Sequence, residues 1–296
     1  MLGKSVTIDP ATGFPTSIDV SSDNQRPTKT TSALASPVTF DVSIENSPPI
    51  SLTAITLATP TADSHGRSAF WTSTSTSQTE NLNLTTTATL DFSGYIDYSV
   101  NVAPLTTSSP LNGSLSISVN VPFHSTVAKF AVGLGKPGAL LQTFVDHFNS
   151  NDTATWKWDG VNGNNALWVG SSTAGLRISP RGESDDWFAA VPYDDKTSPP
   201  IPSEWSNNHT GGISVSRDGV ASIFTGKMMG NSKKVPLEGL TFRFSLLITP
   251  TRPLNLTKHY KERHYQAKGP ANYTAIAEGG ATILVQHQGN VINPWI

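Results

Sequence analysis

The chain has 296 residues, of which 36% are hydrophobic and 14% charged, and its formal net charge is −2. This length can bury a sizeable core as one large β domain or two small ones. The near-neutral charge gives no electrostatic basis for nucleic-acid binding, and no segment approaches the roughly 20 apolar residues that insert across a membrane. The lack of cysteine excludes disulfides, thiolate metal sites and cysteine nucleophiles.

The composition agrees with an exported protein. Ser and Thr are abundant and Lys is sparse, but the start Met1–Lys4 lacks the apolar core of a signal peptide. We therefore expect a secreted or extracellular protein whose signal is not in this chain. The N-x-Ser/Thr sequons are weaker evidence for a glycoprotein, because this composition yields about four by chance. They begin at Asn83, Asn112, Asn151, Asn208, Asn255 and Asn272.

The first 121 residues predict strand after strand. Extended segments at 6–9 and 16–20 flank a turn at 10–13, and a polar loop is expected over 21–32. Apolar and polar residues then alternate with the period of two that a half-buried antiparallel strand requires. Strands are predicted at 40–44, 51–55, 88–100 and 115–121, and the Ser/Thr-rich stretch 72–87 is predicted to be one more exposed strand. This pattern predicts an all-β fold, a large antiparallel β-sandwich.

The middle of the chain continues in β-structure with a single helical stretch at 139–148. The segment Gly133–Gly138 lacks the Gly-Lys-Ser/Thr ending of a phosphate loop, so we expect a tight turn with positive φ. Strands or strand pairs are predicted at 127–132, 156–160, 166–170, 174–178, 212–225 and 240–249.

The last 45 residues differ from the rest. Residues 254–273 are basic and aromatic without strand alternation, whereas 281–287 form a short, continuously apolar strand with polar residues behind it. An apolar run ending in polar residues is typical of a buried parallel strand, and α/β barrels place their chemistry at such strand ends. We predict a sandwich domain over 1–253, and a linker with the first strand of a truncated barrel over 254–296.

Tryptophans are the best candidates for ligand contact, because indole faces pack against the C–H faces of sugar rings. Trp156 and Trp158 are two apart, so on a strand both rings lie on one face. With Trp168 and the polar Asp159, they are predicted to bind carbohydrate. The alternative is that these rings close one end of the core. The remaining predicted binding residues are His287, Gln288 and Asn290, for which the alternative is a simple chain terminus.

No catalytic residue, metal ligand or cofactor is predicted. Glycosidases use two carboxylates that face one substrate, but the acidic clusters at 183–186 and 194–195 are interpreted as solvated loop residues. No His spacing typical of a metal site and no Gly-x-Ser-x-Gly motif is present.

Several motifs carry a family resemblance. They are AKFAVGLGKPG at 128–138, WKWDG at 156–160, LWVG and AGLRI within 167–178, GGISV from 211, FRFSLLITPTRP at 242–253, and ILVQHQGNVINPWI at the end. In their order and spacing the chain resembles the N-terminal domain of proteins related to glycoside hydrolase family 123. The first 120 residues resemble it only in being rich in strands.

The resemblance implies a supersandwich-like domain in front of a (β/α)₈ catalytic barrel. It also implies that ILVQH is the first barrel strand and that His287 and Asn290 face the sugar cleft. The family's catalytic acid pair lies further along the barrel and matches nothing here, which leaves open whether the chain is part of an acetylhexosaminidase-like enzyme. We expect a non-catalytic module that supports or binds glycan beside an absent C-terminal barrel. The alternative is a stand-alone carbohydrate-binding or structural surface module.

Overall fold

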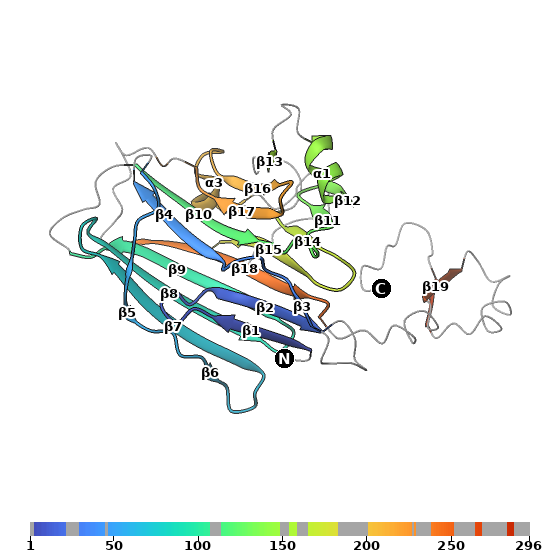
Figure 1. Cartoon of the computed structure of the whole chain (residues 1–296), viewed down its shortest axis with the longest axis horizontal. Helices are drawn as coiled ribbons and strands as arrows, with labels where there is room; N and C mark the ends of the chain where they lie inside the picture. Colours follow the sequence, from blue (N-terminus) through green and yellow to red (C-terminus); the bar gives the residue numbers. More distant parts are fainter. Residues whose placement is uncertain are drawn as a thin grey trace.

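The computed structural model describes residues 3–21, 30–44, 47–106, 114–148, 154–158, 165–182, 201–226, 228 and 238–251, together with the backbone of 264–267 and 283–286. It is built almost wholly from strands, arranged in large antiparallel sheets (Figure 1). The predicted all-β antiparallel sandwich is therefore confirmed.

A ten-stranded antiparallel sheet dominates the molecule. Its strands run in the order β12-β11-β14-β15-β18-β9-β8-β7-β5, with β6 paired to β7. The four longest strands lie side by side at its centre: β18 (Leu240–Thr249), β9 (Tyr95–Pro104), β8 (Leu82–Asp91) and β7 (Ser68–Ser77). The shorter strands are β5 (Thr53–Thr56), β6 (Thr61–Ala62), β11 (Phe130–Gly133), β12 (Lys136–Leu140), β14 (Leu167–Gly170) and β15 (Gly175–Arg181).

Two smaller antiparallel sheets form the second layer over this sheet (Figure 1). The five-stranded one has the order β13 (Thr155–Trp158), β16 (Gly212–Ser216), β17 (Val220–Phe224), β10 (Leu115–Pro122) and β4 (Thr39–Ile44). The three-stranded one comprises β1 (Lys4–Ile8), β2 (Pro15–Ser21) and β3 (Thr30–Ser32). The described helices are short, α1 (Leu141–Phe148) and α3 (Ser203–Ser206).

Aromatic side chains fill the space between the layers. Tyr98 of β9 and Phe244 of β18 stack with ring centroids 4.9 Å apart, and Phe14 of the second layer lies 5.3 Å from Tyr98. The indole of Trp71 on β7 donates a 2.9 Å hydrogen bond to the carbonyl of Gly13. Gly13 has a φ of +77°, so it supplies both the turn before β2 and room for this ring. These contacts join the large sheet to the second layer.

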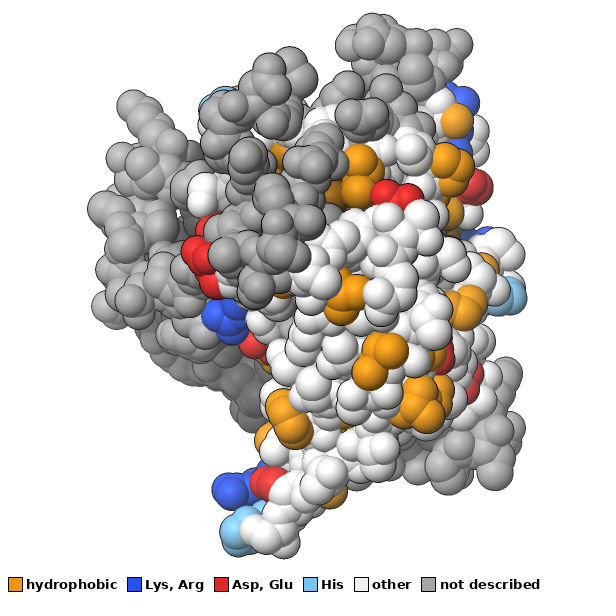
Figure 2. Space-filling view, turned by 90° about the vertical axis from the view of Figure 1, so that its left-hand side faces the viewer, with side chains coloured by type: hydrophobic (Ala, Val, Ile, Leu, Met, Phe, Trp, Pro, Cys, Tyr) orange, Lys and Arg blue, Asp and Glu red, His pale blue; other side chains and the backbone are white. Residues whose placement is uncertain are grey.

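The large sheet has a buried inner face and a polar outer face. On β8 the side chains of Leu82, Leu84 and Ala88 are buried, whereas Thr85 and Thr87 alternate with them on the outer face. Figure 2 shows one side of the molecule, where the coloured and white part of the surface consists mostly of uncharged polar side chains and backbone, with scattered hydrophobic side chains. The outer face is therefore where side chains are available for contact with a ligand or partner.

The Ser/Thr-rich stretch 72–87 corrects the prediction of one exposed strand. It is a hairpin of β7 and β8, with Asn81 in the turn at a φ of +52°. Several of its hydroxyl side chains face the core, including Ser73, Ser75 and Thr86. Because Ser and Thr occupy both faces of these strands, the polarity of the sequence does not mark the alternation or the turn.

The tight turn predicted at 133–138 is confirmed, since Gly133, Leu134 and Gly135 all have positive φ between β11 and β12. β3 lies within the segment predicted as a loop, and α3 was not predicted. Near the C-terminus β20 (Ile283–Gln286) pairs in parallel with β19 (His264–Ala267), a strand for which the sequence shows no alternation. Whether a domain boundary falls at 253/254 stays a prediction. In the described part, no helix is long and apolar enough to cross a membrane.

Candidate functional site

β13 directs Trp156 and Trp158 into the core. Their exposed fractions are 7% and 3%, and Phe144 of α1 meets the Trp156 ring edge-on at a centroid distance of 5.4 Å. Lys157 between them is exposed, with its Nζ 5.5 Å from the Phe224 ring centroid. The expected shared face of the two rings is present, but it points inward. This burial favours the core-packing alternative, and sugar contact by these two residues stays a prediction.

Four predicted binding residues, Asp159, His287, Gln288 and Asn290, lie outside the described residues. The acidic clusters at 183–186 and 194–195 do too. The remaining predicted residue, Trp168, is described and lies in a different environment from Trp156 and Trp158.

Trp168 lies flat against the outer face of the large sheet. Its position on β14 is followed by Gly170, whose cross-strand partner on β15 is Gly175. A Cβ added at Gly170 would come within 2.4 Å of the indole Cζ2, and one at Gly175 within 2.8 Å of the same atom. Neither glycine has a positive φ, so their lack of a side chain provides space for the ring. The two glycines form the floor on which the indole rests.

A hydrogen bond fixes the orientation of this ring. The Trp168 Nε1 donates to the Thr249 Oγ1 of β18 at 2.9 Å. Trp168 is only partly buried, and the sheet closes one face of the indole. The ring is therefore held in a fixed orientation and is partly exposed. An oriented aromatic plane with one side covered is the arrangement on which a sugar ring stacks.

Arg177 is the direct cross-strand neighbour of Trp168 on the same face. Side chains paired in this way have Cβ atoms about 4.5–5.5 Å apart. On its other side Arg177 pairs with Leu247 of β18, which in turn pairs with Tyr95 of β9. Within the described part of the chain the Arg177 side chain has no hydrogen bond or ion pair. Burial lowers the pKa of Arg177, Tyr95 raises it and Arg181 lowers it, but an arginine remains cationic at neutral pH.

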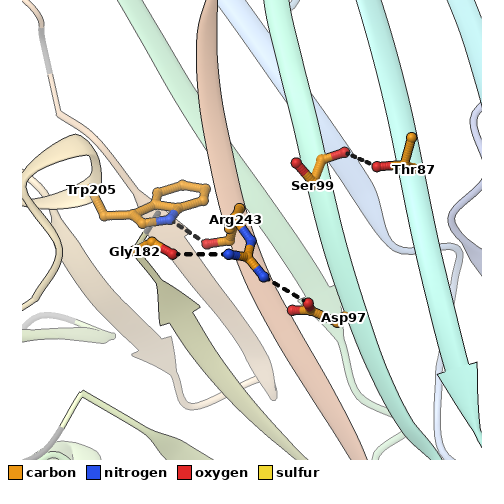
Figure 3. Close-up of polar contacts among 6 residues, drawn as sticks. All are labelled: Thr87, Asp97, Ser99, Gly182, Trp205 and Arg243. Atoms are coloured by element: carbon orange, nitrogen blue, oxygen red, sulfur yellow. Dashed lines mark hydrogen bonds and ion pairs between the residues drawn. The ribbon is translucent and has the colours of Figure 1, made fainter. Parts of the chain in front are cut away.

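An ion pair lies further along the outer face (Figure 3). The Arg243 Nη2 is 3.0 Å from the Asp97 Oδ2, and the Arg243 Nη1 donates to the Gly182 carbonyl at 3.3 Å. The backbone carbonyl of Arg243 accepts a 2.6 Å bond from the Trp205 indole on the inner side. The strand β18 thus joins a core tryptophan to a surface ion pair at a single residue.

The outer face is partly covered between these two groups. Ser179 and Ser245 lie on it and are buried, and the Ser179 Oγ donates to the Asn165 carbonyl at 3.1 Å. The Asp97 Oδ1 is buried without a hydrogen-bond partner among the described residues. Because Asp97 is the cross-strand partner of Ser245 and lies in the same covered strip, we treat the Trp168–Arg177 pair as the open part of the candidate site.

Among the described residues, this face offers no pair of facing carboxylates of the kind that glycoside hydrolysis uses. Asp97 is paired with Arg243, and Asp91 accepts hydrogen bonds in the turn before β9, from the backbone of Ser93, Gly94 and Tyr95. Nor do the described residues contain a group of three His, Asp or Glu side chains suited to a metal ion.

A groove elsewhere is a weaker candidate. It has a volume of about 550 Å³ and lies beside the ends of β4 and β7. Glu80 is the titratable residue in its lining, which otherwise consists of Ile44, Ser47, Pro48, Pro49, Ile50, Ser51, Ser77 and Thr79. It therefore offers neither an aromatic platform nor converging polar groups of the kind found in most ligand sites.

Sequence reasoning missed Arg177 and the two glycines. The signal is present in LWVG and AGLRI, where a hairpin with Gly170 opposite Gly175 also places Trp168 opposite Arg177. This signal can be recognised only when the register between the two strands is known, because Trp168 lies on β14 and its partner Arg177 lies on β15. Residue type alone identified Trp168.

The chain was then compared with known proteins. The family model described as glycoside hydrolase 123, third domain, matches residues 1–250. The match includes the first 120 residues, where the quoted motifs gave no specific resemblance, and its description is of a third domain rather than an N-terminal one. A comparison with curated proteins found no match.

Solved structures show only distant likeness. The GH36 α-galactosidases AgaA and AgaB of Geobacillus stearothermophilus give TM-scores of 0.35 and 0.38, each at 10% identity. The matches cover 78% and 83% of this chain but only 32% and 41% of those chains. An Escherichia coli K12 protein described as a candidate aldose 1-epimerase gives 0.40 at 8% identity, covering 83% of this chain and 96% of that one. At such scores the likeness supports no inference about function.

Proposed function

This chain belongs to the glycoside hydrolase 123 third-domain family, and from that premise we propose that it is a non-catalytic β-sandwich module that binds glycan on the outer face of its large sheet. The observation that carries the proposal is the Trp168 indole, which lies on Gly170 and Gly175 and is held by Thr249. Such a ring presents a preorganised apolar plane to a ligand and loses little conformational entropy on binding.

The non-catalytic part of the proposal is supported by the carboxylates of this face. Asp97 is committed to Arg243 and Asp91 to its turn, so no described acid stands beside Trp168 as a proton donor or nucleophile. We expect the purified chain to bind glycan without hydrolysing aryl glycosides. The family relationship suggests a role beside a catalytic domain, and the Ser/Thr-rich composition suggests an extracellular location. Both are parts of the proposal.

The test is a glycan-array screen followed by calorimetric titration of the best ligand with the chain and with Trp168→Ala. We expect Trp168→Ala to weaken binding by about fivefold to 150-fold, which corresponds to the roughly 1–3 kcal/mol that a nucleobase stacked on an aromatic side chain contributes. The matched control is Phe70→Ala. Phe70 is 53% exposed on the same face of the sheet, five strands from β14 and therefore about 24 Å away. Absence of binding to every glycan, or equal binding by Trp168→Ala, would refute the proposal.

A second function, docking of another protein domain, is favoured by one observation. Phe130, Val132 and Leu140 are 45%, 41% and 56% exposed at the β11–β12 edge beside Trp168. Exposed apolar groups that cluster in this way often mark a protein contact. Replacing Phe130 and Leu140 by Ser distinguishes the two. If this edge is a docking surface, the variant no longer binds the protein partner but still binds glycan at Trp168. If the glycan site extends to this edge, the variant binds long oligosaccharides more weakly.

A further inference from the structure

We infer that the Trp168 site selects anionic sugars, with the sugar ring stacked on the indole and its carboxylate or sulfate group held by Arg177. This inference rests on the proposed function and specifies its ligand class. It depends on where Arg177 lies and on which groups are available to neutralise it.

Arg177 is positioned to reach a sugar on Trp168. The two residues are cross-strand partners on one face, and the flat indole occupies the space above Gly170 and Gly175, on one side of Arg177. A pyranose stacked on the ring carries its exocyclic substituents at its rim. A guanidinium next to that rim can donate two parallel hydrogen bonds to a carboxylate or sulfate, which is the geometry in which arginine binds oxyanions best.

The guanidinium of Arg177 is not committed to a described carboxylate. Its direct neighbours on the outer face are Trp168 and Leu247, and neither carries a charge. The nearby Asp97 is paired with Arg243 through a 3.0 Å contact. A partly buried cation without a carboxylate is costly, and an anionic ligand would offset that cost.

The neighbouring charges favour an anion over a second cation. Arg177 and Arg243 occupy outward positions of β15 and β18, against Asp97 on β9. Within the described residues these strands therefore present more positive than negative charge, although the whole chain carries a formal net charge of −2. A local excess of this kind attracts anionic ligands and makes their binding sensitive to salt.

The experiment titrates the chain with three classes of oligosaccharide of equal length: neutral glucans, uronate oligomers and sulfated glycans. Comparing the uronate oligomers with the sulfated glycans shows whether the site prefers a carboxylate or a sulfate group. We expect the preferred anionic class to bind at least tenfold more tightly than the neutral class at low salt, with the difference shrinking as salt is raised. Arg177→Gln should abolish this preference, while Arg177→Lys should retain part of it. The matched control is Arg67→Gln, which removes the same charge from an exposed ion pair with Asp63.

The outcomes separate this inference from the proposed function. If neutral glycans bind as tightly as anionic ones, and only Trp168→Ala reduces binding, the glycan-binding function stands and the anionic selectivity is wrong. The same conclusion follows if Arg67→Gln weakens anionic binding as much as Arg177→Gln, because the effect is then one of net charge. If no class binds, the proposed function itself fails.

Discussion

The two faces of the ten-stranded sheet use tryptophan in opposite ways. On the inner face Trp71 and Trp205 are 2% and 0% exposed, each with its indole N–H bonded to a backbone carbonyl and its ring edge-on to an aromatic neighbour. On the outer face Trp168 rests on two glycines and donates its indole N–H to the Thr249 side chain. The inner rings stabilise the sandwich, whereas the outer ring is held in a fixed orientation and stays partly exposed. The same residue type therefore serves stability on one side and, in our proposal, recognition on the other.

The largest expected effect comes from removing an inner tryptophan. Trp71→Ala deletes a buried ring and leaves the Gly13 carbonyl without its indole donor, so we expect a loss of about 3–5 kcal/mol in the free energy of unfolding. Urea denaturation followed by circular dichroism measures it. A loss below about 1 kcal/mol would contradict the role assigned to the inner face.

The next effect tests the glycine floor. In Gly170→Ala the new Cβ would lie 2.4 Å from the indole, so the ring must tilt away. We expect a cost of about 1–3 kcal/mol in unfolding free energy and weakened glycan binding. Gly138→Ala in the same sheet is the milder comparison, because its Cβ makes one tight contact, 3.3 Å from the Val132 Cβ, and meets neither the indole nor the backbone closer than that.

A double mutant sharpens this test. Once Trp168→Ala has removed the ring, the new Cβ still meets the Gly175 Cα at 2.8 Å, so adding Gly170→Ala should cost less than it does in the wild type but more than zero. The difference between the two costs is the coupling energy of the ring with Gly170. If the two substitutions are additive in unfolding free energy, the ring does not rest on Gly170.

Trp168→Ala alone should have a small effect on folding. Its ring is partly exposed and makes one side-chain hydrogen bond, so we expect a loss of only about 1–2 kcal/mol, less than for Trp71→Ala. The midpoint of thermal unfolding measures this difference. If the two substitutions destabilise equally, the contrast between the faces fails.

The smallest expected effect concerns Asp41 in the second layer. Burial raises the pKa of this carboxyl, against the opposing hydrogen bonds from Thr39 and Asn120. A folded-state pKa above the unfolded value means that stability falls as pH rises from about 4 through the folded pKa. In Asp41→Asn this decline should be absent. Subtracting urea midpoints of the variant from those of the wild type at pH 4 and pH 6 isolates it. An equal change in both proteins between these pH values would show that Asp41 does not contribute.

Alternation of apolar and polar residues predicted many of the strands, but the alternating segment 88–100, which was predicted as one strand, contains the end of β8, a turn and the start of β9. β10 and β18 follow directly from that pattern, and the hairpin of β16 and β17 follows from its Arg217-Asp218-Gly219 turn. The pattern failed for β7 and β8, because Ser and Thr line both faces of these strands.

The site was harder to predict because alternation shows which residues share a face but not which face is buried. Trp156 and Trp158 do share a face, yet the packing of α1 against β13 turns it inward. The partners of Trp168 depend on the register between β14 and β15 and on the pairing of β15 with the distant β18, neither of which is written in a single strand. The family resemblance was confirmed, while the predicted contacts at Asp159, His287, Gln288 and Asn290 stay predictions.

The most direct test of glycan binding at the outer face is an NMR titration that observes the indole N–H signals of the seven tryptophans. Assigning the Trp168, Trp71 and Trp205 signals by single substitution allows the two faces to be compared in one sample. We predict that the Trp168 indole signal shifts with saturable dependence on glycan concentration, while those of Trp71 and Trp205 stay in place. Saturable binding that leaves the Trp168 signal unmoved would contradict the account.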